Sequence, residues 1–160
     1  MSDGADSLVQ GGESAPFAVR LTVRAYELDP LGHVNQAVYH SYAEHARTQL
    51  LRAVGLPVDV VLRAGVAAVL LTSQMKYLRE LRADDEIDVS ASMKFGDGKT
   101  FHVDTVITKV DGTVSAEFTG TFGLMDLTAR RLVADPRGRL AALSTDQQAF
   151  YEASSARMSS

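Results

Sequence analysis

The chain has 160 residues, of which 46% are hydrophobic and 22% are charged, and its formal net charge is -4. This length suits one domain, and the composition is that of a globular protein rather than a disordered one. The acidic balance and the lack of a dense Lys/Arg run argue against nucleic acid as a partner. Because the sequence contains no cysteine, disulfides, thiolate metal sites and a cysteine nucleophile are excluded.

The N-terminal segment differs from a signal peptide. Residues 1–15 have acidic side chains scattered among Gly and Ser, and they lack a basic start and an apolar run. The apolar stretches, such as Val66 to Leu71, are far shorter than the roughly 20 residues that cross a bilayer. We therefore expect a flexible tail over residues 1–15, no membrane partner and a cytoplasmic location.

Regular structure begins with a predicted strand. Apolar residues occupy every second position from Phe17 to Ala25, which is the period of a half-buried strand ending near Tyr26. A proline and a glycine then break this pattern, and from Val38 to Val54 apolar residues recur every four positions. That spacing predicts one long helix that stops at residues 55–57, and a short helix is expected over 58–63.

The remainder of the chain predicts antiparallel strands. The apolar run over 66–71 predicts a buried strand that continues with alternating residues as far as Tyr77. Glycine-containing turns separate three further predicted strands, at 87–95, 100–110 and 114–124. A terminal helix is expected over 141–153. This is an α+β pattern, in which a curved antiparallel sheet covers the apolar stripe of one long helix.

The segment from Glu27 to Arg47 carries the candidate chemistry. The carboxylate of Asp29 stands in the turn, and the free backbone amides of residues 36–38 begin the helix, where partial positive charge gathers. A thioester carbonyl between them would gain stabilisation of its developing negative charge from the amides. Asp29 would activate water or attack the carbonyl itself. Such a site requires no metal or cofactor.

A family resemblance rests on this same segment. The sequence resembles the hotdog-fold thioesterases over the run ELDPLGHVNQAVY from Glu27 to Tyr39, followed by Tyr42, Glu44, Ala46 and Arg47. The most similar subgroup is the 4-hydroxybenzoyl-CoA thioesterase-like family, which includes acyl-CoA, acyl-carrier-protein and enediyne polyketide thioesterases. The resemblance implies a hotdog domain over residues 16–136. The C-terminal extension at 137–160 would then be a short helix followed by disorder.

The resemblance also implies roles for individual residues. Asp29 matches the catalytic aspartate, and Gln36 falls where a backbone amide polarises the thioester carbonyl. Some relatives carry the catalytic carboxylate on the long helix instead, which makes Glu44 a second candidate. The implied partners are an acyl-CoA or acyl-carrier-protein substrate and a second copy of the chain. The homodimer would have its active sites at the subunit interface and would often pair into a tetramer.

Three polar residues of the turn have structural roles as alternatives to catalytic ones. An aspartate before Pro and Gly commonly bonds its own backbone as a turn former, and Asp29 is able to combine this with catalysis. Asn35 has the composition and position of a helix N-cap, a role that is compatible with contact to the substrate. His33 orients water, hydrogen-bonds the acyl group or makes a structural hydrogen bond.

Four residues are candidates for contact with the acyl group or the thioester. Val38 and Tyr39 would line the acyl pocket, although apolar and aromatic residues on a helix are more often part of the core. Thr72 and Ser73 would contact the thioester region, although strand residues of this type usually only pack or pair. All four are therefore listed as substrate-binding candidates.

The remaining charged groups are interpreted more simply. Glu44 and Arg47 lie three positions apart on the helix, which predicts an ion pair. His40 and Glu44 share a helix face, but His45 points elsewhere and no HExxH pattern exists, so no metal site is expected. Four cations are either partners for the phosphates of CoA or solvated surface charges: Lys76, Arg79, Arg82 and Lys99.

The function that the sequence favours is hydrolysis of an acyl thioester. One alternative is a hotdog acyl-thioester dehydratase or hydratase, an enzyme class that typically uses a histidine base, for which His33 is the candidate. A second alternative is a non-catalytic domain that binds acyl thioesters.

Overall fold

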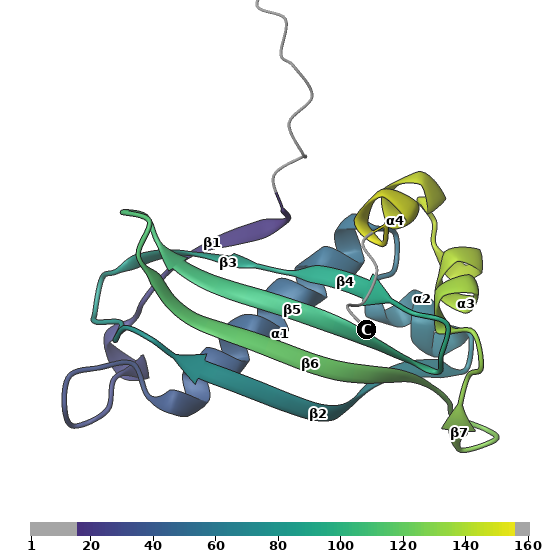
Figure 1. Ribbon diagram of the computed structural model, residues 1–160, viewed down its shortest axis with the longest axis horizontal. Helices are drawn as coiled ribbons and strands as arrows, with labels where there is room; N and C mark the ends of the chain where they lie inside the picture. Colours follow the sequence, from purple (N-terminus) through teal and green to yellow (C-terminus); the bar gives the residue numbers. More distant parts are fainter. Residues whose placement is uncertain (1–15, 156–160) are drawn as a thin grey trace, which may run out of the picture.

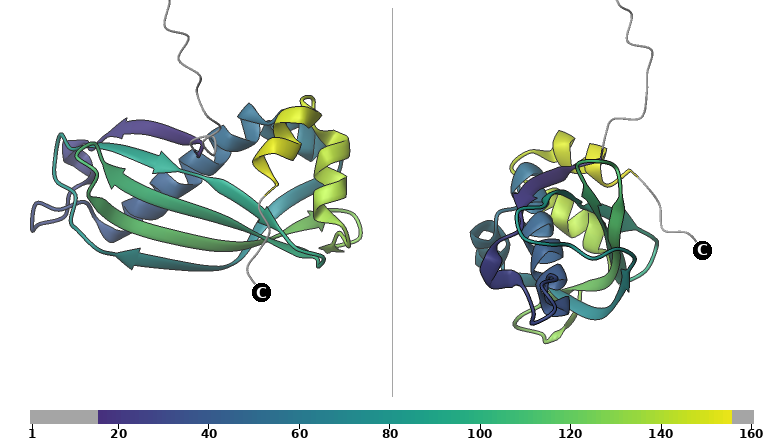
Figure 2. Two further views of the ribbon diagram at one scale, coloured as in Figure 1. Left: turned by 45° about the horizontal axis from the view of Figure 1, so that its top comes forward. Right: turned by 90° about the vertical axis from the view of Figure 1, so that its left-hand side faces the viewer.

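The computed structural model describes residues 16–155, in which seven strands form one antiparallel sheet that curves around a central helix (Figure 1). The flexible tail predicted over 1–15 lies outside the described residues, as do the last five residues of the predicted C-terminal extension. Viewed from the end, the helix lies within the curve of the sheet (Figure 2). None of the helices between residues 16 and 155 is long and apolar enough to span a membrane.

The sheet has the strand order β1-β3-β5-β6-β2, with β4 paired to β5 and β7 paired to β6. The strands are β1 (Ala18–Thr22), β2 (Val66–Tyr77), β3 (Glu86–Ser90), β4 (Ser92–Phe95), β5 (Thr100–Lys109), β6 (Val114–Asp126) and β7 (Arg131–Leu132). The helices are the 3-10 helix η1 (Ala25–Glu27) and the α-helices α1 (Gln36–Ala53), α2 (Val58–Arg63), α3 (Pro136–Leu143) and α4 (Gln147–Ala153).

The predicted long and short helices are confirmed as α1 and α2. Helix α1 buries the stripe that the four-residue spacing predicts, including Tyr42, Ala46 and Leu50, against the concave face of the sheet. Its N-terminus is capped by Asn35, whose side-chain oxygen accepts a hydrogen bond from the amide of Ala37 at 2.9 Å. The predicted N-cap is therefore confirmed.

The first strand is shorter than predicted. It ends at Thr22 instead of near Tyr26, and η1 occupies residues 25–27. The backbone of Val23 pairs with residues 84 and 85, and the carboxylate of Glu27 turns back to accept from the amide of Arg24 at 2.8 Å. Side-chain bonding of this kind competes with extended structure, and simple alternation of apolar residues does not reveal it.

The strand β2 was predicted correctly, but its predicted burial is wrong. It lies at one edge of the sheet, where β6 is its partner among the described strands. Leu70 and Leu71 are 50% and 46% exposed, and the register shifts between Leu70 and Thr72. An apolar run alone does not distinguish a strand buried on both faces from an edge strand that presents apolar side chains outward.

Two other predicted elements are interrupted. The strand expected over 87–95 divides at Ala91 into β3 and β4. The amide of Ala91 donates to the carbonyl of Phe17, just before β1. The helix expected over 141–153 is two helices, α3 and α4, with a break at residues 144–146. At this break the hydroxyl of Ser144 donates to the carbonyl of Val54 at 2.6 Å, which anchors the C-terminal helices to the end of α1.

Candidate active site

A hollow of about 260 Å³ lies beside the N-terminus of α1. The turn before α1, the first residues of α1 and the segment that follows β2 supply its walls. The lining residues are Asp29, His33, Val34, Gln36, Tyr39, Tyr77, Leu78, Arg79 and Glu80. The structure thus brings together four of the predicted site residues: Asp29, His33, Gln36 and Tyr39.

Asp29 is held firmly in its turn. Its Oδ1 accepts hydrogen bonds from the amides of Leu31 at 2.9 Å and His33 at 3.3 Å. Its own amide donates to the carbonyl of His33 at 2.7 Å, and Gly32 completes the turn with φ +76°. The turn-forming role of Asp29 is therefore confirmed. Within residues 16–155 no donor contacts Oδ2, so one oxygen of the carboxylate is available to chemistry.

The amides at the start of α1 are less available than the sequence suggests. The amide of Ala37 donates to the side chain of Asn35, and the amide of Val38 donates to the Asn35 carbonyl at 2.9 Å. The Gln36 amide has no hydrogen-bond acceptor among the described residues. Of the three amides expected to polarise a carbonyl, Gln36 thus supplies the free donor, at the positive end of the helix dipole.

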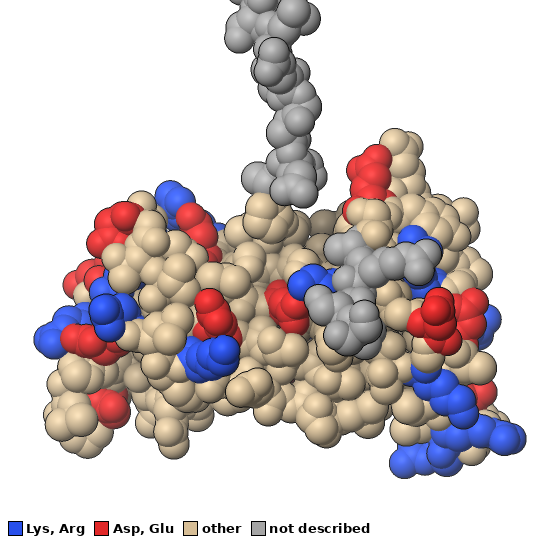
Figure 3. Space-filling model, viewed as in Figure 1, with Lys and Arg blue, Asp and Glu red and all other residues tan. Residues whose placement is uncertain are grey.

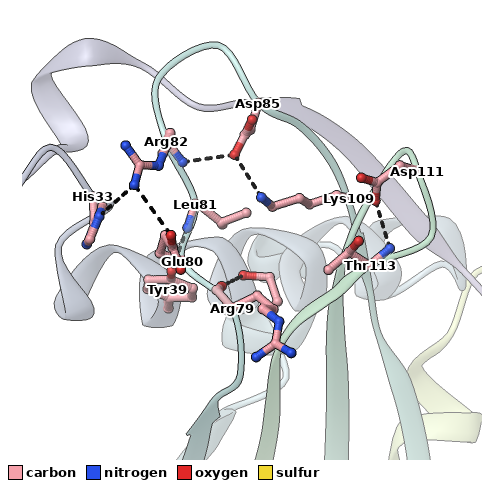
Figure 4. A network of polar contacts seen from close by, with 11 residues as sticks. His33, Tyr39, Arg79, Glu80, Leu81, Arg82, Asp85, Lys109, Asp111 and Thr113 are labelled. Atoms are coloured by element: carbon pink, nitrogen blue, oxygen red, sulfur yellow. Dashed lines mark hydrogen bonds and ion pairs between the residues drawn. The ribbon is translucent and has the colours of Figure 1, made fainter.

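The segment Leu78–Arg82 closes one side of the hollow through a network of polar contacts (Figure 4). The amide of Leu81 donates to the hydroxyl of Tyr39 at 3.3 Å, and the carbonyl of Leu81 accepts from the amide of Val34 at 2.8 Å. Burial raises the pKa of Tyr39, so its hydroxyl stays protonated. The segment following β2 is therefore tied directly to the start of α1.

His33 is engaged from this same segment. Its Nε2 lies 3.3 Å from Nη2 of Arg82, which also contacts Glu80 at 3.4 Å (Figure 4). A guanidinium has donors and no acceptor, so Nε2 of His33 accepts this bond and the ring proton belongs on Nδ1. The lone pair that a histidine base would use is thus occupied by Arg82.

A buried carboxylate, Glu27, joins the turn to the second turn of α1. Its Oε1 accepts from the hydroxyl of Tyr42 at 2.9 Å, and its carbonyl accepts from the amide of Asn35 at 2.9 Å. Burial, aided by the neighbouring carboxylate, raises the pKa of the Tyr42 hydroxyl well above its usual range. Glu27 therefore fixes how α1 leaves the turn that carries Asp29.

The other predicted site residues lie elsewhere. Val38 packs partly against the core, and Glu44 is exposed two helical turns beyond Gln36. Thr72 and Ser73 are exposed near the middle of the edge strand β2. The described residues place no cluster of three or more His, Asp or Glu side chains where it could hold a metal ion.

The predicted ion pair between Glu44 and Arg47 does not form as a direct contact among the described residues. The Arg47 guanidinium instead lies 4.7 Å from the centre of the Phe122 ring. Partial burial lowers the pKa of Arg47, and Glu44 opposes this shift from a distance. Cation–π contact with the concave face of the sheet is favoured here over pairing in solvent.

Comparison with known proteins assigns the chain to a family. Residues 23–151 match the family model described as the thioesterase-like superfamily. The chain belongs to this superfamily. It is 37% identical over 99 residues to the chloroplastic acyl-acyl carrier protein thioesterase ATL3 of Arabidopsis thaliana. That match covers 62% of this chain and 52% of the plant protein, so the chain spans about half of this relative's length.

Solved structures of other proteins share the architecture of this superfamily member. The probable thioesterase YbaW of Escherichia coli is 25% identical, with a TM-score of 0.69 over 79% of this chain and 95% of its own. The protein SAV2348 of Staphylococcus aureus, solved in complex with CoA, is 20% identical. Its TM-score is 0.76 over 94% of this chain and 93% of its own. The predicted hotdog fold is confirmed.

Several residues that line the Asp29 hollow of this thioesterase-like chain were not predicted from the sequence. Tyr77 ends β2 and Leu78 follows it, and their position beside α1 depends on pairing between distant strands. Tyr77 packs edge-on to Tyr39 with ring centres 5.1 Å apart and donates to the carbonyl of Gln36 at 3.2 Å. The hydrogen bond between Tyr42 and Glu27, which lies outside the lining, was also missed, although a tyrosine on a buried helix stripe requires a partner for its hydroxyl.

Proposed function

We propose that this chain hydrolyses acyl thioesters carried on CoA or on an acyl carrier protein. One observation carries the proposal: the Asp29 carboxylate and the free Gln36 amide line one hollow at the positive end of α1. A carbonyl held between them meets a hydrogen-bond donor on one side and a carboxylate on the other. This arrangement suits addition to a carbonyl carbon followed by loss of a thiolate.

In the water-activation route, the unengaged Oδ2 of Asp29 takes a proton as water oxygen attacks the carbonyl carbon. The Gln36 amide donates to the oxyanion that forms. When the tetrahedral intermediate collapses, the carbon–sulfur bond breaks and the proton passes to the departing thiolate, which gives acid and thiol. In the nucleophilic route, Oδ2 attacks the carbonyl carbon and the carbon–sulfur bond breaks, which releases the thiolate and leaves a mixed anhydride on Asp29. Water then hydrolyses the anhydride to the free acid and the Asp29 carboxylate, and the proton released goes to the thiolate. Both routes use the same two groups.

The names of the relatives support this choice of substrate. The plant relative is named as an acyl-acyl carrier protein thioesterase, and the staphylococcal structure contains CoA. A dehydratase or hydratase is less well supported, because Arg82 occupies the lone pair of His33 that would act as the base. A non-catalytic binding domain would bind the same thioesters without releasing thiol.

The test is thiol release from a panel of acyl-CoA and acyl-carrier-protein substrates of varied chain length. Asp29→Asn keeps an oxygen that accepts from the turn amides but removes the charge, so we expect kcat to fall at least about 100-fold. Asp97→Asn, in the exposed hairpin between β4 and β5, is the matched control and should retain wild-type rates. Wild-type rates in folded Asp29→Asn would refute the mechanism.

We also propose that two copies pair through β2, with tetramers arising from such dimers. The edge strand offers unpaired backbone groups together with two exposed leucines, Leu70 and Leu71. Pairing about a two-fold axis would bring Thr72 and Ser73 of both copies near that axis. In this dimer Thr72 and Ser73 would approach the other copy's substrate across the interface.

Light scattering after gel filtration tests this pairing. Leu70→Lys places a charge on the pairing edge and should convert dimers to monomers. Leu62→Lys is the matched control, because Leu62 is 48% exposed on α2 and lies outside β2. Dimers that persist in Leu70→Lys, or monomers of wild-type protein at micromolar concentration, would contradict pairing through β2.

A further inference from the structure

A second hollow, of about 500 Å³, lies at the opposite end of β2 from the Asp29 hollow. It opens where α2 passes into β2 and where β6 turns into β7. Its lining includes Val66 at the start of β2, Asp126 at the end of β6, Arg131 on β7 and Arg139 on α3. The mechanism proposed above uses none of these residues.

The charge at this hollow is positive although the chain is acidic overall. Arg131 and Arg139 line it, and Arg130 adjoins the lining residues in sequence, as does Arg63, which is paired with Asp59 at 3.3 Å. Figure 3 shows Lys and Arg side chains gathered at this corner, below and beside β7 in the view of Figure 1. One carboxylate, that of Asp126, lines the hollow beside the two arginines.

The groups around this hollow are partly committed. Asp126 accepts from the amides of Ala129 at 2.8 Å and Thr128 at 2.9 Å, which lowers its pKa and keeps it in the turn. Arg139 donates from Nη2 to the carbonyl of Ala64 at 3.2 Å, which holds its guanidinium at the rim. Arg131 makes no ion pair within 4 Å in the part of the chain that the structure describes. Both guanidiniums retain donors for an anion.

The position of this hollow relative to a second copy follows from the edge strand. Two-fold pairing of a strand with its own copy is antiparallel, so opposite ends of the two strands become neighbours. The 12 residues of β2 span about 40 Å. Val66, which lines the second hollow, starts the strand, and Tyr77, which lines the Asp29 hollow, ends it. In the dimer, the second hollow of each copy therefore lies beside the Asp29 hollow of the other.

We propose that Arg131 and Arg139 bind the phosphate at the far end of the pantetheine arm whose thioester lies in the other copy's Asp29 hollow. The inference rests on the proposed thioesterase function and on pairing through β2. Guanidinium groups match phosphate oxygens with paired donors, and phosphate is the anion that CoA and carrier-protein thioesters share. The second copy thus completes the binding site.

The first experiment compares one acyl group on three carriers: CoA, the carrier protein and unphosphorylated pantetheine. The variant is Arg131→Gln/Arg139→Gln, and Arg20→Gln on β1 is the control, because it removes one exposed positive charge at the far edge of the sheet. We expect the double variant to raise KM about tenfold for the phosphorylated carriers and to leave acyl-pantetheine kinetics unchanged.

Each outcome of this comparison is informative. A rise in KM confined to acyl-CoA or to acyl-carrier protein supports the proposal and identifies the carrier. Equal effects on all three carriers, or no effect on any, overturn it. If wild-type protein fails to hydrolyse acyl-pantetheine and the other two thioesters, the proposed function itself fails, which is a separate result.

A mixed dimer tests whether the arginines act across the interface. One copy carries Asp29→Asn and the other carries Arg131→Gln/Arg139→Gln, with different tags for purification. If the arginines serve the opposite copy, both defects fall in one site and the other site is wild type. We then expect about half of the wild-type kcat/KM for acyl-CoA. If they serve their own copy, neither site is intact and about one twentieth remains, which overturns the proposal.

Discussion

Removal of one hydroxyl at the Glu27–Tyr42 contact should measure how strongly the turn is held on α1. In Tyr42→Phe, the buried Glu27 carboxylate keeps its bond from the Arg24 amide and loses the one from Tyr42. A lost hydrogen bond to a charged, buried acceptor costs about 2 kcal/mol of folding free energy. For a domain of this size, that loss lowers the melting temperature by about 6 °C. Urea denaturation and thermal melting followed by circular dichroism check both values.

The same contact predicts a pH dependence. The pKa of Tyr42 is raised above its usual 10.0, so below pH 10 the residue is protonated in the folded and unfolded chains alike and its contribution is complete. Above pH 10 only the unfolded chain releases the proton, so the free energy of unfolding falls by up to about 1.4 kcal/mol per pH unit. Tyr42→Phe lacks this loss, and the difference between the two proteins should narrow above pH 10.

Tyr151→Phe is the control for both measurements, because Tyr151 is 48% exposed on α4. Its stability should stay within about 0.5 kcal/mol of wild type. The reasoning is refuted if Tyr42→Phe loses less than about 0.5 kcal/mol at neutral pH. It is also refuted if the difference from wild type stays constant or widens above pH 10.

Three further substitutions test other parts of the structure. Asn35→Ala removes the N-cap of α1 and should cost about 1 kcal/mol in urea denaturation, and an unchanged midpoint would contradict the capping role. Gly120→Ala places a Cβ 2.6 Å from one phenylalanine ring and 2.9 Å from another and should cost about 1–3 kcal/mol, whereas Gly98→Ala meets no atom within 4 Å and should cost less. Phe150→Ala empties a fully buried position on α4 and should cost about 3–5 kcal/mol, and a loss below about 1 kcal/mol would show that α4 does not complete the core.

Elements with strong local signals were predictable from the sequence. The spacing of apolar residues located α1, and Asn35 signalled its cap, because both depend on neighbours within one helix. The turn around Asp29 was also predictable, since the side chain of an aspartate near Pro and Gly commonly accepts hydrogen bonds from nearby backbone amides. These features are decided within about one helical turn of chain.

Features that depend on distant partners were not predictable. The exposure of Leu70 follows from β2 being at the sheet edge, which the strand order decides. One wall of the hollow beside Asp29 comes from the end of β2 and the residues after it. The Gln36 amide is the free donor there because Asn35 accepts hydrogen bonds from the amides of Ala37 and Val38. Arg47 contacts the ring of Phe122, whereas the helix spacing predicted an ion pair with Glu44. Each of these outcomes depends on which strand or loop packs against α1.

The contact between Ser144 and Val54 also has a consequence for synthesis of the protein. The two residues are 90 positions apart, and the neighbouring amide of Thr145 donates to the carbonyl of Gly55 at 2.9 Å. During synthesis, α1 and all strands of the sheet therefore leave the ribosomal exit tunnel before the segment from Ser144 to α4, which packs against their end. During that interval the apolar surface later covered by Phe150 is open to solvent. Chaperone binding to the nascent chain should therefore persist until α4 emerges, and deletion of α4 should yield aggregated protein.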